Sequence, residues 1–142
     1  MAKAYISEQL RQVVEEAARY RCGYCLLPQK ISGLRLQIDH IRPQAIGGLT
    51  VEDNLWLACI ACNRCKRDLT HFADPQTGQI VLLFNPRRQI WHEHFQWNAD
   101  GTIIQGLTEC GRATVVALQM NNEIIVASRS LWVQFGLWPP ES

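Results

Sequence analysis

Two cysteine pairs, Cys22-Gly23-Tyr24-Cys25 and Cys59-Ile60-Ala61-Cys62, enclose the stretch that decides the fold of this 142-residue chain. A two-residue spacing lets both sulfurs of a turn face one ion, and zinc prefers four soft ligands in a tetrahedron. The two pairs therefore predict a structural zinc site that joins the start and the end of the segment between them. The alternative is a set of four buried or redox-active thiols.

Cys65 leaves the choice of zinc ligands open, because Cys62 and Cys65 form a further pair with the same spacing. We favour Cys59 with Cys62, since Cys62 can then bind the ion just before a helix begins. Cys65 and Cys110 are then expected to be packed thiols.

Between the cysteine pairs, Ile38-Asp39-His40-Ile41-Arg42-Pro43 combines a carboxylate with an imidazole. The carboxylate is a hard oxygen ligand that suits magnesium or manganese. Histidine has an unperturbed pKa of about 6.5, so it can take a proton from water near neutral pH. Because neighbouring residues on a strand point to opposite faces, Asp39 and His40 can share one site only at a strand end. Pro43 and the loop at Gly47-Gly48 supply such an end.

Four short runs follow one another in a specific order: Asp39-His40-Ile41-x-Pro43, Gly47-Gly48, Asn54-Leu55-Trp56-Leu57 and Cys59-x2-Cys62-Asn63-x2-Lys66. This order and spacing resemble the motif of the HNH nucleases, also called the ββα-metal or His-Me finger family. The resemblance covers about residues 22–69. Asn63 stands where the family name has its second His, and an Asn carbonyl oxygen can also bind a hard cation. The chain thus resembles the HNN variant of the four-cysteine zinc subgroup.

The resemblance implies an endonuclease that hydrolyses phosphodiester bonds of nucleic acid by a one-metal mechanism. DNA is the favoured substrate over RNA, and the product would carry a 5′-phosphate. His40 would be the general base that activates water, and Asp39 and Asn63 would hold Mg²⁺ or Mn²⁺. Asn54 would fix the loop and orient His40 through a hydrogen bond with the backbone or the imidazole. Basic side chains that could contact phosphates are Arg42, Arg64, Lys66 and Arg67.

Two other functions remain open at this stage. The first is a zinc-stabilised nucleic-acid-binding module that lacks catalysis, although the joint presence of Asp39, His40 and Asn63 argues against it. The second is a structural zinc protein whose C-terminal extension binds a protein partner.

Net charge and hydropathy limit the possible partners and location of the protein but do not decide its function. The net charge is only +1, so no global field favours a polyanion. Residues 1–70 hold ten Lys and Arg against seven Asp and Glu, whereas residues 71–142 hold four against six. No apolar run approaches the roughly 20 residues of a membrane span, and the first residues lack the apolar core of a secretory signal. We therefore expect a cytoplasmic protein without a membrane partner.

The patterning predicts an α+β protein with a nuclease module at 1–70 and a packed α+β extension at 71–142. The module is expected to contain a helix from Ser7 to about Tyr20, strands at 34–41 and 55–58, and a short basic helix at 63–69. Residues 28–33 and 45–53 are expected to be loops. The extension is expected to form a small antiparallel sheet from strands at 79–84, 90–97 and 102–107, with turns at 74–78 and 98–101. Helices at 108–120, capped by Thr108, and at 123–135 are expected to follow.

The extension carries no chemistry that its residues assign. The run Leu83-Phe84-Asn85-Pro86-Arg87, followed by Trp91-x2-His94-Phe95-x-Trp97, resembles the extension of a group of small bacterial HNH proteins. His92 and His94 share a face of the expected strand. We favour partly buried strand histidines over a role in the cleft or in nucleic-acid contact.

The aromatic side chains of the extension could form core or stack on bases, and its basic side chains could contact phosphates or be plain surface charge. Trp91, Phe95 and Trp97 share the opposite face of the expected strand and should pack as core rather than stack on unpaired bases. Arg87 and Arg88 are equally compatible with phosphate contacts and with plain surface charge.

Overall fold

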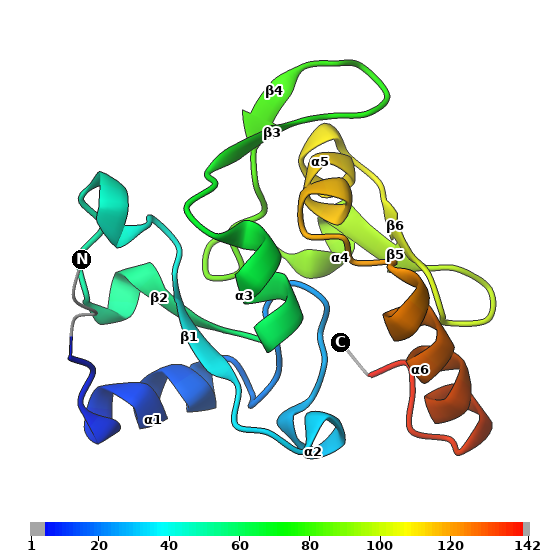
Figure 1. Ribbon diagram of the computed structural model, residues 1–142, viewed down its shortest axis with the longest axis horizontal. Helices are drawn as coiled ribbons and strands as arrows, with labels where there is room; N and C mark the ends of the chain where they lie inside the picture. Colours follow the sequence, from blue (N-terminus) through cyan, green and yellow to red (C-terminus); the bar gives the residue numbers. More distant parts are fainter. Residues whose placement is uncertain (1–4, 141–142) are drawn as a thin grey trace. The chain divides into compact units, whose positions relative to one another are not determined.

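The computed structural model describes residues 5–140 and separates the chain into two compact units, Met1–Thr70 and His71–Ser142 (Figure 1). Helices and small antiparallel sheets occur in both units, which confirms the predicted α+β class. Among the described residues, no helix has the length and apolar character that crossing a membrane requires.

The first unit contains a hairpin followed directly by a helix, the ββα order that the sequence predicts. Strand β1 (Gln37–His40) pairs antiparallel with β2 (Leu55–Ala58), and His40 lies opposite Leu55. Helix α1 (Glu8–Ala17) precedes the hairpin and begins at Ser7, whose hydroxyl accepts a hydrogen bond from the Leu10 N–H at 3.1 Å. The remaining elements of this unit are α2 (Gln29–Ser32), the 3₁₀ turns η1 (Gln44–Ile46) and η2 (Glu52–Asn54), and α3 (Ile60–Lys66).

Helix α3 begins three residues earlier than the expected start at Asn63. Cys59 is its N-cap, and the Cys59 sulfur accepts the N–H of Cys62 at 3.4 Å. Cys62 therefore lies in the first turn of the helix rather than before it. A predicted zinc ligand thus also caps the helix that carries Asn63.

The second unit consists of two hairpins and two longer helices. Strand β3 (His71–Ala73) pairs with β4 (Ile80–Leu82), and β5 (Phe95–Trp97) pairs with β6 (Ile104–Gly106), both antiparallel. The predicted turns at 74–78 and 98–101 connect the strands of these hairpins. Helices α5 (Glu109–Ala117) and α6 (Glu123–Gln134) follow, capped by Thr108 and Asn122. The expected sheet is thus two separate hairpins, and β3 had not been predicted.

The expected strand at 90–97 is wrong in its first half, because Trp91–His94 form one helical turn, α4. Trp91 and Phe95 are buried with ring centroids 5.1 Å apart, so the aromatic side chains pack as core as predicted. His92 is exposed and His94 is half-buried, so the two histidines do not share a strand face. The His94 Nδ1 lies 2.7 Å from the Thr108 hydroxyl, at the start of α5.

Two buried charged side chains join distant segments of the second unit. Asp74 accepts two hydrogen bonds from the Arg112 guanidinium, at 2.9 and 2.8 Å. Arg129 is buried, and it donates to the carbonyl oxygens of Thr102 at 2.9 Å and Met120 at 2.7 Å. These contacts tie the hairpins to helices α5 and α6.

Candidate active site

Four cysteine sulfurs of the first unit lie within 4.8 Å of one another, and all four residues are buried: Cys22, Cys25, Cys59 and Cys62. The Cys25 and Cys59 sulfurs are 3.7 Å apart, close to the roughly 3.8 Å expected between sulfurs that each lie about 2.3 Å from zinc. The donor set therefore fits a structural zinc ion. No other group of three or more His, Cys, Asp or Glu side chains among residues 5–140 could hold a metal, so Cys59 rather than Cys65 completes the site.

The electrostatics of this cluster also favour a bound cation. Burial raises the pKa of the Cys22 thiol, whereas hydrogen bonds from Cys22 and Cys25 lower the pKa of Cys59. A divalent cation would hold all four sulfurs as thiolates, which couples metal binding to the folding of this unit.

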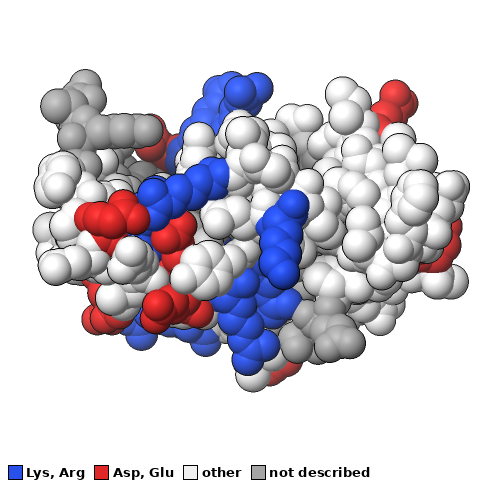
Figure 2. Space-filling model, turned by 90° about the horizontal axis from the view of Figure 1, so that it is seen from below, with Lys and Arg blue, Asp and Glu red and all other residues white. Residues whose placement is uncertain are grey.

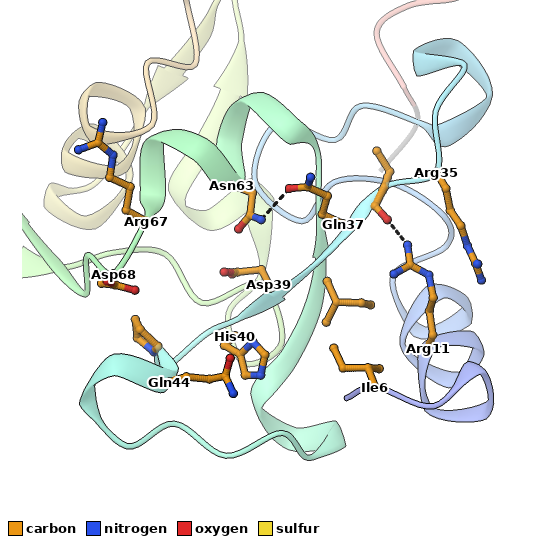
Figure 3. Close-up of a pocket in the computed structure, with 13 residues that line it drawn as sticks. Ile6, Arg11, Arg35, Gln37, Asp39, His40, Gln44, Asn63, Arg67 and Asp68 are labelled. Atoms are coloured by element: carbon orange, nitrogen blue, oxygen red, sulfur yellow. Dashed lines mark hydrogen bonds between the residues drawn. The ribbon is translucent and has the colours of Figure 1, made fainter. Parts of the chain in front are cut away.

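A hollow of about 350 Å³ lies beside the hairpin in the first unit. Figure 3 shows Asp39 and His40 entering it from β1 and Asn63 from α3. Both adjacent residues reach the same hollow because β1 ends at His40, where the strand alternation stops. The structure thus brings together three of the predicted catalytic residues.

Asp39 is only 3% exposed, and both of its carboxylate oxygens have partners. Its Oδ2 accepts a hydrogen bond from the Tyr24 hydroxyl at 2.6 Å, and its Oδ1 accepts one from the Lys66 ammonium at 3.1 Å. Burial raises the pKa of Asp39, and the positive charge of Lys66 opposes that shift. Burial also raises the pKa of Tyr24, which keeps its hydroxyl protonated as a donor.

The prediction that Lys66 contacts a phosphate is wrong. Its side chain is buried, and its Nζ also donates to the carbonyl oxygens of His40 at 3.1 Å and Ile41 at 3.3 Å. The ammonium is therefore satisfied inside the protein. It holds the end of β1 instead of reaching a surface phosphate.

His40 is half-buried, and its Nε2 lies 2.9 Å from the Thr50 hydroxyl oxygen. Burial lowers the pKa of His40, so the imidazole is neutral near pH 7 and can accept a proton. Thr50 thus holds one of the two ring nitrogens.

Asn54 fixes the loop between β1 and β2. Its Oδ1 accepts the Arg42 N–H at 2.8 Å, and its Nδ2 donates to the carbonyl oxygens of Arg42 at 3.0 Å and Leu49 at 2.9 Å. Both amide hydrogens are used in this way, so Asn54 has none to give to the His40 ring. The contact that orients the imidazole comes from Thr50 instead.

The two adjacent glycines of the same loop, Gly47 and Gly48, are each required for a different structural reason. Gly47 has a φ of 92°, in the left-handed region that favours glycine. At Gly48 a Cβ would collide with the carbonyl oxygen of Arg42. The loop can therefore close against Arg42 only without a side chain at this position.

Asn63 completes the oxygen ligands on the α3 side of the hollow. Its Nδ2 donates to the Gln37 Oε1 at 2.8 Å, and Figure 3 shows its carbonyl oxygen turned toward Asp39. A carboxylate and an amide carbonyl are ligand types that suit a hard divalent ion. The residues present therefore fit the magnesium or manganese that the sequence predicts.

The three remaining predicted phosphate contacts differ in their positions. Arg67 borders the hollow, but its guanidinium points away from Asp39 in Figure 3. Arg64 is exposed on α3. Arg42 is exposed and donates to the Ile46 carbonyl oxygen of its own loop at 3.0 Å. Arg67 is thus the one of these three that lies at the edge of the hollow.

Charges of both signs occur close together on the surface of the first unit. Arg35, for example, pairs with Glu8 and also with Glu15, the latter at 3.1 Å. On the face shown in Figure 2, Lys and Arg side chains gather beside Asp and Glu side chains. This face therefore offers local cationic positions rather than one extended basic surface.

Sequence reasoning missed three side chains that shape the hollow: Tyr24, Gln37 and Thr50. Each acts on a residue that lies 10 to 26 positions away along the chain. No local spacing marks such contacts. Only the position of Tyr24 between two predicted zinc ligands offered a signal.

Comparisons with known proteins agree with this geometry. Residues 22–69, which contain the four cysteines and the hollow's Asp39, His40 and Asn63, match the family model described as HNH endonuclease. The Septu protein PtuB of Bacillus mycoides (strain KBAB4) is 27% identical over 126 residues, and the match covers 71% of this chain and 42% of that protein. The chain thus spans about two fifths of that relative's length. No solved structure matches the chain. The similarity to the HNH endonuclease family is therefore shown for residues 22–69, about a third of the chain.

Proposed function

We propose that this protein is a metal-dependent endonuclease that hydrolyses phosphodiester bonds of DNA. The convergence of Asp39, His40 and Asn63 on one hollow supports this most strongly. Phosphodiester hydrolysis requires an activated water, neutralisation of charge on the phosphate and help for the leaving oxygen. A base and two hard oxygen ligands at one place meet these needs, whereas a binding module requires none of them.

We assign His40 as the general base. We assign the tautomer in which Nε2–H donates to the Thr50 hydroxyl 2.9 Å away, so that Nδ1 carries the lone pair that accepts a proton from the attacking water. Lys66 supports this geometry, because its ammonium donates a hydrogen bond to the backbone carbonyl oxygen of His40. The imidazole is therefore fixed through both its ring and its backbone.

Asp39 and Asn63 would hold the catalytic Mg²⁺ or Mn²⁺. When bound, that ion stabilises the charge that develops on the phosphate and on the departing 3′ oxygen. The chain contributes the orientation of its ligands: Tyr24 and Lys66 hold Asp39, and Gln37 holds the amide nitrogen of Asn63. The four-cysteine zinc site serves a separate, structural purpose.

Arginine side chains near the hollow would position the DNA backbone. The guanidinium of Arg67 points away from Asp39, so it suits a phosphate next to the cleaved one rather than the cleaved phosphate. Arg64 and Arg42 are exposed and extend the same role to further phosphates. None of the six cysteines forms a disulfide, as is usual in a reducing compartment, and we propose the cytoplasm as the place of action.

The test uses zinc-replete protein with labelled duplex DNA, single-stranded DNA and RNA of one sequence. Each is incubated with Mg²⁺, with Mn²⁺ or with a chelator that removes only the added ion. We expect DNA cleavage that requires the added ion and leaves 5′-phosphate ends, which ligase joins without prior kinase treatment. DNA binding without cleavage under any of these conditions would instead support the non-catalytic module, and cleavage of RNA alone would overturn the proposed substrate.

A further inference from the structure

Tyr24 lies within the zinc site in the sequence, and its side chain contacts Asp39 of the catalytic hollow. It lies between Cys22 and Cys25, and its own N–H donates to the Cys22 sulfur at 3.4 Å. Its side chain is fully buried, and the hydroxyl donates to the Asp39 Oδ2 at 2.6 Å. One residue therefore contacts a zinc ligand through its backbone and the catalytic carboxylate through its side chain.

The other partner of Asp39 is also carried by an element that contains a zinc ligand. Lys66 lies in α3, whose first turn contains Cys62, and its ammonium donates to the Asp39 Oδ1 at 3.1 Å. We call the Tyr24 hydroxyl and the Lys66 ammonium the Asp39 clasp. Each of these two groups donates a hydrogen bond to one oxygen of the carboxylate.

The clasp has a direct consequence for metal binding. An ionised carboxylate has about four lone-pair positions on its two oxygens. One contact to each oxygen stops rotation of the group and leaves a fixed set of lone pairs for an ion in the hollow. Hydrogen-bond partners of metal ligands act in this way, and their loss typically costs about 10- to 100-fold in metal affinity or activity.

We propose that Tyr24 is a positioning residue that couples the zinc site to the catalytic site. Its hydroxyl fixes the orientation in which Asp39 binds the catalytic divalent ion. This inference rests on the proposed function, in which Asp39 holds that ion. Because the hydroxyl is neutral and does not contact zinc, its removal should weaken binding of the catalytic ion without changing either the charge of the hollow or the zinc ligands.

The first test compares Tyr24→Phe with wild type and with Tyr20→Phe, a matched control at a tyrosine that is 43% exposed. Mn²⁺ is titrated into zinc-replete protein without nucleic acid, and the free ion is measured by electron paramagnetic resonance. We expect Mn²⁺ affinity about 10-fold weaker in Tyr24→Phe, unchanged affinity in Tyr20→Phe and equal zinc content in all three. The DNA cleavage rate of Tyr24→Phe should recover as Mn²⁺ is raised.

Asp39→Asn separates failure of this inference from failure of the proposed function. If Asp39→Asn abolishes Mn²⁺ binding but Tyr24→Phe binds like wild type, the positioning role is overturned and the proposed function stands. If wild type shows no Mn²⁺ binding that depends on Asp39, both are overturned.

A second measurement leaves position 24 unmutated, in case Tyr24→Phe does not fold. The chain has three tyrosines, so labelling with 3-fluorotyrosine gives three ¹⁹F signals, assigned with Tyr5→Phe and Tyr20→Phe. We expect Mg²⁺ to shift the Tyr24 signal but not the Tyr20 signal, and Asp39→Asn to abolish that shift. A Tyr24 signal that Mg²⁺ leaves unmoved at concentrations that saturate cleavage would overturn the coupling.

Discussion

Each of the two units of this chain is stabilised internally by a different kind of contact. In the first unit, a four-cysteine cluster and a network of polar side chains join a hairpin of four-residue strands to α3. In the second unit, buried aromatic rings and two buried charged side chains join hairpins to helices. The first unit's similarity to the HNH endonuclease family can be recognised because its motif residues lie close together in the sequence. The second unit's residues show how it folds but not what it does.

A structural metal in the first unit would have a physical reason. A domain of about 70 residues rarely gains enough stability from its hydrophobic core alone, and a structural metal is a common remedy. Its buried core contains side chains such as Val14, Leu55 and Leu57 together with the four cysteines. The cysteine cluster lies where β2 ends and α3 begins, so an ion there would hold the ββα arrangement together.

The largest expected effect is therefore loss of the zinc site. We expect Cys22→Ser to lose zinc and to unfold the first unit, because structural zinc contributes about 10–16 kcal/mol in small zinc domains. Circular dichroism and elemental analysis would measure both changes. Four of the five tryptophans lie after residue 90, so near-ultraviolet dichroism should show that the second unit stays folded. Cys65→Ser is the control, and equal damage from both variants would contradict the assignment of Cys22 as a ligand.

The next effect concerns the buried ion pair of the second unit. Hydrogen bonds from Arg112 hold the pKa of Asp74 well below its usual value. A carboxyl whose folded pKa is depressed stabilises the fold fully above its unfolded pKa, about 3.9, and loses that contribution as the pH falls toward the folded pKa. We expect Asp74→Asn to lower the thermal unfolding midpoint by a constant amount from pH 7 to 5.

The difference between wild type and Asp74→Asn should shrink below about pH 4. Glu93→Gln is the control, since Glu93 is an exposed carboxylate of the same unit. A difference that grows as the pH falls would show that the Asp74 pKa is not depressed.

A smaller effect is expected from the loop of the first unit. Asn54→Ala removes three hydrogen bonds, so we expect a loss of about 1–3 kcal/mol in the free energy of unfolding and slower DNA cleavage. Urea unfolding and initial cleavage rates would measure these changes. Asp53→Ala, at the exposed neighbouring position, should match wild type in both. A variant that unfolds like wild type would show that the loop does not depend on Asn54.

The sequence predicted features that depend on local spacing. The four zinc ligands, the caps Ser7 and Thr108 and the hairpin turns follow from residues a few positions apart. The turn of helix at Trp91–His94 could not be predicted in this way, because burial of both Trp91 and Phe95 overrides the strand-like composition of this stretch.

Lys66 illustrates a signal that was present but misread. From the sequence, the basic residues near Asn63 are expected to contact phosphates. Lys66, however, follows Cys62 by four residues, and residues four apart share a helix face. Because Cys62 faces the buried cluster, Lys66 also points inward, toward Asp39. Contacts such as Tyr24 with Asp39 and Thr50 with His40 have no comparable local signal.

The central claim is that His40 activates water in a metal-dependent cleavage. The most direct measurement is the initial rate of nicking of supercoiled plasmid, in Mn²⁺, by zinc-replete wild type and His40→Ala. We predict a loss of about 10²- to 10⁴-fold in His40→Ala with unchanged zinc content and unfolding midpoint, and a loss of about two- to tenfold in Thr50→Val. Equal nicking by wild type and His40→Ala would contradict the account.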